Sequence, residues 1–339
     1  MSTRTDFPVL DFSRYKTDFD AFARDIFMAS EEWGFFILTN HNIPNVDRMY
    51  ELSTQFFDLP KDQKAEKTLD ATMTGYDGKN LTAFAASEGV AFGMPAGRLF
   101  DKPNLPAWWT RPRLQEVEDF KASCYDISLN IMSCLAVQLG LERSFFDATH
   151  QHKDPGNPLK LIKYPRFEKQ PDGIPRLSEH TDWGSITFVF TETPGLEMRD
   201  PEDQWTAVPT IPGGVVVNIA DSMSLRTNKK LKSAFHRIRW DTVGVDKERL
   251  SIAYFVHPNN DAVLSDVTTD ADPKEAKETA ITYRDYLKIR LGLTFGSARE
   301  DGDAGVDFDT VDNATYERVK NLGIANYGAI ESIQPEVST

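Results

Sequence analysis

The sequence predicts an α+β protein in which a mostly helical N-terminal half packs against a single β core of the sandwich or jelly-roll type. Helical patterns dominate the first half, whereas residues 159–258 consist of short apolar runs separated by Gly, Pro and Asp. Short strands with turn signals between them are typical of sandwiches and jelly rolls. The chain has 339 residues, 40% of them hydrophobic, and shows no internal repeat, which suits one large core.

The N-terminal half contains five recognisable elements, of which the fourth is ended by a proline. They are an extended segment "FPVLDF" (7–12), a helix (16–33), an apolar strand "GFFILTN" (34–40), a helix before Pro60 (46–60) and a long helix (114–139). Residues 64–107 lack a regular pattern and contain scattered glycines and prolines. Because loops of this length in compact domains are usually functional or mobile, we expect this segment to lie near a substrate pocket.

The C-terminal half reads as strands followed by one helix. The apolar runs are "LKLIKYPRF", "SITFVF", "LEMRD", "WTAVP", "GGVVVNIAD", "RIRW" and "LSIAYFVHP". A last helix over 282–291 precedes a polar, acidic tail. We therefore divide the chain into a mostly helical region (1–155), a β core (156–300) and a tail (301–339) that together form effectively one structural unit.

Composition excludes several classes of function. The formal net charge of −14 repels nucleic acid, whose binding depends on neutralising phosphates. No apolar stretch approaches the roughly 18 residues that span a bilayer, and the N-terminus lacks the apolar core of a secretory signal. Cys124 and Cys134 lie ten residues apart on one predicted helix, too far along its axis to form a disulfide. We expect buried thiols, a cytoplasmic location and a monomer.

The stretch "RLSEHTDWGSITFVF" contains the first candidate for chemistry. On a strand, side chains at i and i+2 share a face, so His180 and Asp182 project together. An imidazole nitrogen beside a carboxylate oxygen forms most of a metal site, or else an ordinary hydrogen-bonded pair. The pair alone does not decide between these two interpretations.

A third ligand of suitable hardness is present further along the chain. Redox iron commonly uses two histidines and one carboxylate on one face of the metal, with other positions open. "SAFHRI" supplies His236, whose flanking residues suit a strand. Of the six histidines, only His180 and His236 lie within β segments that a jelly roll brings face to face. His41, followed by "NIP", is interpreted as a structural turn residue.

A candidate anion-binding motif follows the third ligand. "RLSIAYF" places Arg249 thirteen residues after His236, with Ser251 on the same strand face. Arginine holds carboxylates bidentately, and the serine hydroxyl adds a donor. R-x-S recurs by chance in most proteins, so its weight comes from its order and distance after the candidate ligands.

Taken together, these motifs resemble the iron(II)- and 2-oxoglutarate-dependent dioxygenases of the isopenicillin N synthase-like group, which carry H-x-D…H…R-x-S. The likeness extends over most of the chain. It includes the stretches "FPVLDF", "WGFFILTNHNIP", "FFDLPKDQK", "LKLIKYPRF" and "NIADSMSLRTNKKLKSAFHRI". The resemblance implies a double-stranded β-helix, or jelly roll, flanked by N-terminal and C-terminal helices.

The resemblance also implies roles for individual residues. His180, Asp182 and His236 would bind Fe(II), with no catalytic residue beyond these ligands. The distal carboxylate of 2-oxoglutarate would be held by Arg249, Ser251 and the hydroxyl of Tyr164. Phe255 occupies a position that often meets substrate in the family, although it could equally be a core phenylalanine. Asn218 and Asp221 are interpreted as turn residues rather than supports of the metal ligands.

Three departures from the family pattern are visible. Ile162 stands where many plant members have an asparagine near the co-substrate, Asn42 replaces a glycine after His41, and Ala220 replaces one before Asp221. A few relatives also keep R-x-S without using 2-oxoglutarate. The alternatives are therefore an iron-dependent oxidase or oxidative cyclase that does not use 2-oxoglutarate, and, more remotely, a non-catalytic jelly-roll binding protein.

The implied reaction is oxidation of a C–H bond with dioxygen, while 2-oxoglutarate is converted to succinate and carbon dioxide. Hydroxylation, desaturation, epoxidation and ring formation all remain open. We expect a small-molecule substrate in specialised-metabolite biosynthesis. Aromatic residues around the irregular segment favour an apolar or ring-containing one, unless they only pack a lid on the core: Phe84, Phe92, Phe100, Trp108 and Trp109.

Overall fold

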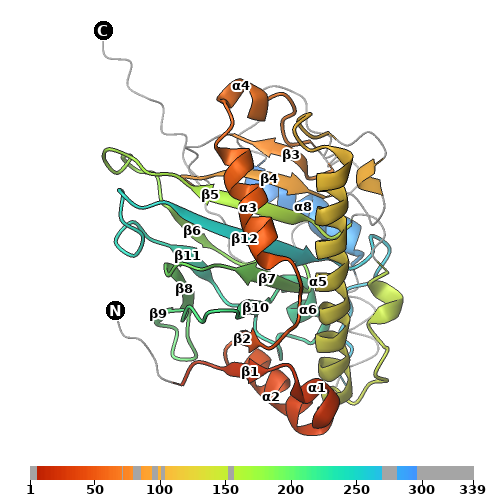
Figure 1. The fold of residues 1–339 in the computed structure, drawn as a ribbon. Coiled ribbons are helices and arrows are strands. Elements are labelled where there is room, and N and C mark those ends of the chain that lie inside the picture. The colour runs from red at the N-terminus through yellow and green to blue at the C-terminus, as the bar shows by residue number, and fades with distance from the viewer. Residues whose placement is uncertain are drawn as a thin grey trace.

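The fold is built from two β-sheets with helices on the outside (Figure 1). In the computed structural model, the described residues are 6–70, 72–78, 85–93, 98–100, 104–151, 156–268 and 281–295, the last five as backbone. The large sheet has eight strands in the order β1-β2-β10-β7-β12-β5-β4-β3, and the small sheet has four in the order β6-β11-β8-β9. The prediction of a jelly-roll core with flanking helices is confirmed.

The strands of the large sheet come from both halves of the chain. They are β1 (Val9–Asp11), β2 (Phe35–Thr39), β10 (Val215–Ile219), β7 (Ile186–Phe190), β12 (Arg249–Val256), β5 (Leu159–Tyr164), β4 (Glu88–Phe92) and β3 (Thr74–Asp77). The small sheet contains β6 (Leu177–His180), β11 (His236–Ile238), β8 (Leu196–Arg199) and β9 (Trp205–Ala207). All pairings are antiparallel except that of β1 with β2.

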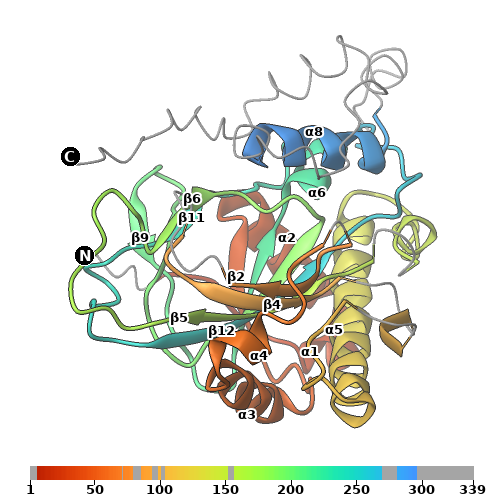
Figure 2. The ribbon, with the colours of Figure 1, turned by 90° about the horizontal axis from the view of Figure 1, so that it is seen from above.

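The helices of the N-terminal half cover the outer face of the large sheet. They are α1 (Arg14–Thr17), α2 (Phe19–Glu32), α3 (Val46–Phe57), α4 (Lys61–Lys64) and α5 (Arg111–Gln138), with the 3₁₀ turns η1 (Arg98–Phe100) and η2 (Asp147–Thr149). Leu52 and Phe56 of α3 recur at a helical spacing and are fully buried. Figure 1 shows α3 and α5 crossing in front of the sheet. The short α6 (Asp221–Arg226) and α8 (Tyr283–Phe295) lie on the opposite side (Figure 2).

Alternation along the strands separates two environments. Ile252 and Tyr254 of β12 belong to the large hydrophobic cluster shared with α3 and α5. The intervening side chains of β12 face the small sheet, because successive side chains of a strand point to opposite faces. Two smaller apolar clusters pack between the sheets, one joining β2 and β10 to β8, the other joining β5 to β6 and β11. The polar residues of interest lie on this inner face.

Gly34 makes the sharp connection from α2 into β2. Its φ of +69° lies in the left-handed region, which is strained for residues with a Cβ. A Cβ at this position would also collide with the backbone carbonyl of Lys232. The glycine therefore lets strand β2 start directly after the helix and enter the sheet beside β10.

The predicted elements are largely found, with two differences. The helix predicted over 16–33 is divided into α1 and α2, since Asp18 between them leaves the helical conformation (φ −154°, ψ 61°). The segment predicted as irregular, 64–107, contains strands β3 and β4, and β4 extends the large sheet beside β5. Gly75 lies within β3 and Gly89 within β4. Because glycine has no side chain to pack and is uncommon inside strands, these residues hide the sequence pattern that predicts a strand.

The long helix α5 holds both cysteines. Cys124 and Cys134 are buried and form no disulfide. Among the described residues, no helix is both long and apolar enough to cross a membrane. The proposed boundary at residue 155 stays a prediction, although four strands before it belong to the large sheet. The predicted tail, 301–339, lies outside the described residues.

Candidate active site

Three side chains converge at one end of the small sheet. His180 ends β6, His236 begins β11, and the two are register partners across the antiparallel pair. The Nε2 atoms of both histidines lie 3.8 Å from Oδ1 of Asp182. One nitrogen or oxygen atom from each of the three residues lies within 4.8 Å of the other two. The side chains are 14%, 7% and 8% exposed, so a group bound among them would be nearly enclosed.

Backbone carbonyls orient the two imidazoles. Nδ1 of His180 lies 2.9 Å from the carbonyl of Ser178, and Nδ1 of His236 lies 3.3 Å from that of Ala234. A carbonyl can only accept, so each Nδ1 carries a proton, and Nε2 is the atom that has a free lone pair when the ring is neutral. Burial, together with the neighbouring His236, lowers the pKa of His180 to about 3. His180 is therefore neutral near pH 7, which is the form that binds metals.

The carboxylate of Asp182 is fixed from its other side. Asn218 donates from Nδ2 to Oδ2 of Asp182 at 2.8 Å. Burial alone would raise the pKa of Asp182, but the two imidazoles and the hydrogen bond from Asn218 hold it below its usual range. Two neutral imidazoles and one carboxylate on one side of a small space fit the donor set of redox Fe(II).

The interpretation of Asn218 and Asp221 as turn residues is wrong. Asn218 lies within strand β10 and reaches Asp182, as described above. Asp221 begins helix α6 and accepts hydrogen bonds from Thr181, Ser233 and Tyr286. The carboxamide of Asn218 and the carboxylate of Asp221 therefore both hold the segment that carries His180 and Asp182.

A buried guanidinium lies on the inner face of the large sheet. Arg249 pairs in register with Tyr164 across β12 and β5, and its guanidinium carbon lies 5.5 Å from the centre of the Tyr164 ring. Ser251 hydrogen-bonds the Tyr164 hydroxyl. Arg249 is 2% exposed, yet its Nε and Nη2 have no hydrogen-bond partner among the described residues. Because buried N–H groups are normally satisfied, these two atoms indicate a site for a carboxylate.

The inner face between these two features is partly polar. Phe255 lies on this face of β12 and is partly exposed. Lys160 of β5 pairs in register with Ala253, and its Nζ lies 3.3 Å from Oδ2 of Asp77 on β3. Ile162, which stands where many plant members have an asparagine, lies opposite Ser251 and contributes an apolar side chain. These side chains form a surface with both aromatic and charged groups.

A third histidine, His257, lies close to the candidate metal ligands. The ring of His257 lies beside Gly184, where it would contact an added Cβ, and its Nδ1 is buried without a hydrogen-bond partner among the described residues. Burial lowers its pKa to about 4, against the opposing effect of the Asp182 charge. His257 was not among the residues predicted for the site. The sequence does contain a sign of its location: His257 follows Phe255 by two residues, so the two side chains are expected on the same face of the strand.

The aromatic residues considered as substrate contacts lie on the outer side of the large sheet. Phe92 and Trp109 are buried in the large hydrophobic cluster, and Phe100 and Trp108 pack against it. Phe84 lies outside the described residues. For the four described residues, packing is therefore the correct interpretation, and they give no support to a ring-containing substrate.

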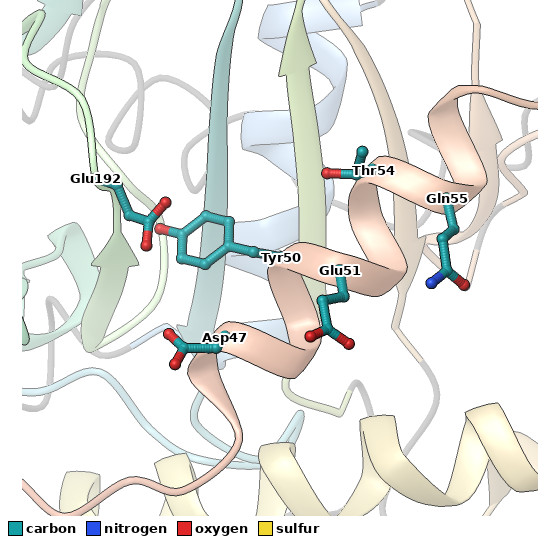
Figure 3. A pocket seen from close by; sticks show the side chains of 6 residues that line it. All are labelled: Asp47, Tyr50, Glu51, Thr54, Gln55 and Glu192. Atoms are coloured by element: carbon teal, nitrogen blue, oxygen red, sulfur yellow. The ribbon is translucent and has the colours of Figure 1, made fainter.

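A separate surface pocket lies beside helix α3, on the outer side of the large sheet. Figure 3 shows the residues that line it: Asp47, Tyr50, Glu51, Thr54, Gln55 and Glu192. Three of these side chains are carboxylates. Tyr50 packs against the large hydrophobic cluster, whereas Arg249 faces the small sheet. This pocket contains none of the residues predicted for the site.

Comparisons with known proteins agree with this geometry. A family model described as the 2OG-Fe(II) oxygenase superfamily matches residues 156–258, and one described as the N-terminal part of a non-haem dioxygenase in morphine synthesis matches residues 7–102. A UPF0676 protein of Schizosaccharomyces pombe is 30% identical over 309 residues, covering 85% of this chain and 92% of that protein. The 1-aminocyclopropane-1-carboxylate oxidase 3 of Arabidopsis thaliana is 28% identical over 332 residues, covering 92% and 98%.

The same likeness is found among solved structures. The crystal structure of the Neurospora crassa thymine hydroxylase with α-ketoglutarate and thymine is similar, with a TM-score of 0.76 and 26% identity. The match covers 86% of this chain and 99% of that one. The similarity therefore extends over the helices and both sheets.

Proposed function

This chain belongs to the 2OG-Fe(II) oxygenase superfamily, and from that premise we propose that it oxidises a C–H bond of a small molecule with Fe(II), 2-oxoglutarate and dioxygen. The observation that carries the proposal is the meeting of His180, Asp182 and His236 at the small sheet, together with the unpartnered N–H groups of Arg249 on the inner face of the large sheet. A metal site and a carboxylate site between the two sheets suit a co-substrate that has a keto acid at one end and a carboxylate at the other.

The proposal assigns each group a task. His180, Asp182 and His236 bind Fe(II), while Arg249, Ser251 and Tyr164 hold the distal carboxylate of 2-oxoglutarate. When bound, iron and 2-oxoglutarate together supply the oxidising power that dioxygen needs to attack a C–H bond. The residues of the chain keep His180 neutral, hold the Asp182 carboxylate ionised and exclude water with the apolar clusters between the sheets.

For the substrate, we propose a compact ring-bearing molecule that also carries polar groups. Phe255 can stack on a ring, and Lys160 with Asp77 can bind an acceptor and a donor on the same molecule. Small substrates of this kind are named for two relatives, thymine for the Neurospora crassa enzyme and 1-aminocyclopropane-1-carboxylate for the Arabidopsis thaliana oxidase. The match to a dioxygenase of morphine synthesis supports a role in specialised-metabolite biosynthesis.

We also propose that the enzyme is a cytoplasmic monomer. The two free, buried cysteines suit a reducing compartment. Light scattering of the purified protein checks the monomer, because a dimer doubles the measured mass.

The first test is anaerobic titration with Fe(II) and 2-oxoglutarate. The wild-type protein should develop the weak visible absorption of a keto acid chelate at one iron per chain, and His236→Ala should not. His41→Ala removes a buried histidine that accepts from the backbone N–H of Ile43 and packs against Phe190, outside the candidate site, so this control should keep the absorption. A wild-type protein that binds iron without this absorption contradicts the use of 2-oxoglutarate.

A second measurement separates the proposal from the alternative, an oxidase that uses no keto acid. This alternative is tested because the Arabidopsis thaliana relative is named an oxidase. With 2-oxoglutarate labelled at C1, coupled turnover should release one labelled carbon dioxide per product. Product formed without labelled carbon dioxide identifies the oxidase instead. Absence of bound iron after anaerobic reconstitution identifies a non-catalytic binding protein.

A further inference from the structure

A second guanidinium is buried beside Arg249. Arg176 is 0% exposed and stacks over the ring of Trp240 at 4.5 Å, with the Tyr164 ring at 5.9 Å. Its Nη1 donates to the carbonyl of Pro165 at 2.6 Å, and its Nη2 donates to that of Lys247 at 2.8 Å, with the Tyr164 carbonyl 3.5 Å away. Arg176 therefore bridges the C-terminal end of β5 and the chain that leads into β12.

Neither guanidinium has a carboxylate for a partner. Within the described ranges, no ion pair joins Arg176 or Arg249 to an acidic residue, and Arg176 Nε makes no hydrogen bond. Buried charges in proteins are normally paired, because desolvating a lone ion is costly. Two such cations near one tyrosine ring, at 5.9 and 5.5 Å from its centre, repel each other, and a bound anion would relieve this repulsion. Burial and the nearby Arg249 lower the pKa of Arg176 to about 10, which still leaves it charged near pH 7.

Accordingly, we propose that Arg176 is a positioning residue for the distal carboxylate of the co-substrate, an inference that rests on the proposed function. It clamps the strand ends that carry Tyr164 and Arg249, and it adds a second positive charge beside the unpartnered N–H groups of Arg249. The fork of a guanidinium reaches two carbonyls at once, which a lysine ammonium does not reproduce with the same geometry. Affinity for a dicarboxylate thus depends on Arg176, whereas affinity for the keto acid end does not.

The test compares two ligands that differ only in the distal carboxylate. Dissociation constants of 2-oxoglutarate and of 2-oxobutyrate are measured anaerobically with Fe(II), from the absorption of the keto acid chelate. In Arg176→Met, we expect the dissociation constant of 2-oxoglutarate to rise at least tenfold and that of 2-oxobutyrate to change less than twofold. Arg176→Lys keeps the charge without the clamp, so it should fall between the wild type and Arg176→Met.

A matched control is available in Arg226. Arg226 is 3% exposed, stacks over Phe146 at 5.0 Å and, like Arg176, has an unpartnered Nε among the described residues. Unlike Arg176, it lies at the end of helix α6 and donates to the hydroxyl of Thr149 in η2. Arg226→Met should leave both dissociation constants unchanged. A loss of the same size for both ligands in Arg176→Met would reveal a general structural role and overturn the inference.

The outcomes also distinguish this inference from the proposed function. Unchanged 2-oxoglutarate affinity in Arg176→Met overturns the role of Arg176 alone. Failure of the wild type to bind 2-oxoglutarate overturns the proposed function and the inference with it. If Arg176→Met does not fold, Arg176→Lys is the variant that tests the inference. A loss of affinity for 2-oxoglutarate but not for 2-oxobutyrate supports the role of Arg176, and an equal loss for both ligands contradicts it.

Discussion

Asn218 determines how the carboxylate of Asp182 is presented. By donating to Oδ2 it leaves Oδ1 facing the two imidazoles, each at 3.8 Å. Groups that hydrogen-bond metal ligands orient them and are needed for tight binding. A metal at this site therefore depends on a residue that does not touch it.

We predict that Asn218→Ala weakens Fe(II) binding by about 10- to 100-fold, because the freed carboxylate can rotate away from the imidazoles. Isothermal titration with Fe(II) under anaerobic conditions measures the change. Val216→Ala, two residues earlier on the same face of β10, is the control and should alter the affinity less than twofold. Equal losses in both variants would show that Asn218 acts only through the packing of the strand.

At this scale, the sequence predicts what is local and misses what depends on cross-strand neighbours. His180 and Asp182 share a strand face by spacing alone, the order of residue types along the chain indicates His236, Arg249 and Ser251, and the resemblance adds Tyr164. The side chains do meet in the two groups described, while their roles as ligands stay predictions. Asn218 was misread because nothing near it in sequence indicates that β10 pairs with β7, the strand that follows the segment carrying Asp182.

Among the elements, strands β3 and β4 are held by a buried triad. Lys64 Nζ lies 2.8 Å from Oε2 of Glu88 and also donates to the carbonyl of Phe57, while the Tyr76 hydroxyl donates to the same oxygen at 2.5 Å. The side chains of Lys64 and Glu88 are 9% and 6% exposed. The triad joins helix α4 to both strands, which helps explain how a glycine-rich segment forms part of a sheet.

We predict that Lys64→Met lowers the free energy of unfolding by about 3–5 kcal/mol, because it leaves the Glu88 carboxylate buried without a cation. Urea denaturation measures the change. The double variant Lys64→Met/Glu88→Gln should recover at least half of the loss. As a control, Arg14→Met removes the half-exposed pair with Asp25 and should cost less than about 1 kcal/mol. Losses of similar size for Lys64 and Arg14 would contradict the importance of burial.

Helix α8 is connected to the candidate metal ligands through Asp221. Oδ2 of Asp221 accepts from Thr181, which lies between His180 and Asp182, and from Tyr286 of α8. Arg290 of α8 lies 3.2 Å from the same oxygen. One carboxylate thus holds both the C-terminal helix and the segment of the metal ligands.

We predict that Arg290→Met makes amide hydrogen exchange about tenfold faster in α8 and in residues 180–182, because Asp221 loses the cation that balances its buried charge. Exchange followed by mass spectrometry measures both regions. The exposed Arg284 of the same helix is the control, and Arg284→Met should change neither region. Faster exchange in α8 alone would disprove the connection.

For the molecule as a whole, buried neutral histidines link stability to pH. His150 is 1% exposed, with Nδ1 2.9 Å from the carbonyl of Phe146 and Nε2 2.8 Å from the hydroxyl of Ser185. Burial lowers its pKa to about 3. The unfolded chain, with an ordinary histidine pKa of about 6.5, takes up a proton first. Its contribution to stability is therefore complete above about pH 6.5 and is lost as the pH falls toward 3.

We predict that His150→Asn reduces the loss of unfolding free energy between about pH 7.5 and about pH 5.5 by about 1.4 kcal/mol relative to the wild type. The asparagine amide can still donate toward the Phe146 carbonyl but does not titrate. Urea denaturation of the metal-free proteins at both pH values gives the difference. A variant whose stability keeps the full pH dependence would show that His150 is already protonated in the folded state.

The fold class of the whole molecule could be predicted, but the strand order could not. Turn signals between short apolar runs indicated the jelly roll, and helical spacing indicated α2, α3 and α5. Which strands form the edges depends on contacts between distant segments. β1 and β2 occupy one edge of the large sheet and β3 the other, so the N-terminal region supplies both.

This arrangement affects how the chain folds as it is synthesised. β2 ends at Thr39, yet its partner β10 begins at Val215, so the ribosome must add most of the chain before the first strands can join the sheet. A nascent chain halted before that point exposes unpaired strands to other molecules, which is a route to aggregation. Expression of residues 156–300 without their N-terminal neighbours would leave the opposite defect, a large sheet that lacks two strands at each edge.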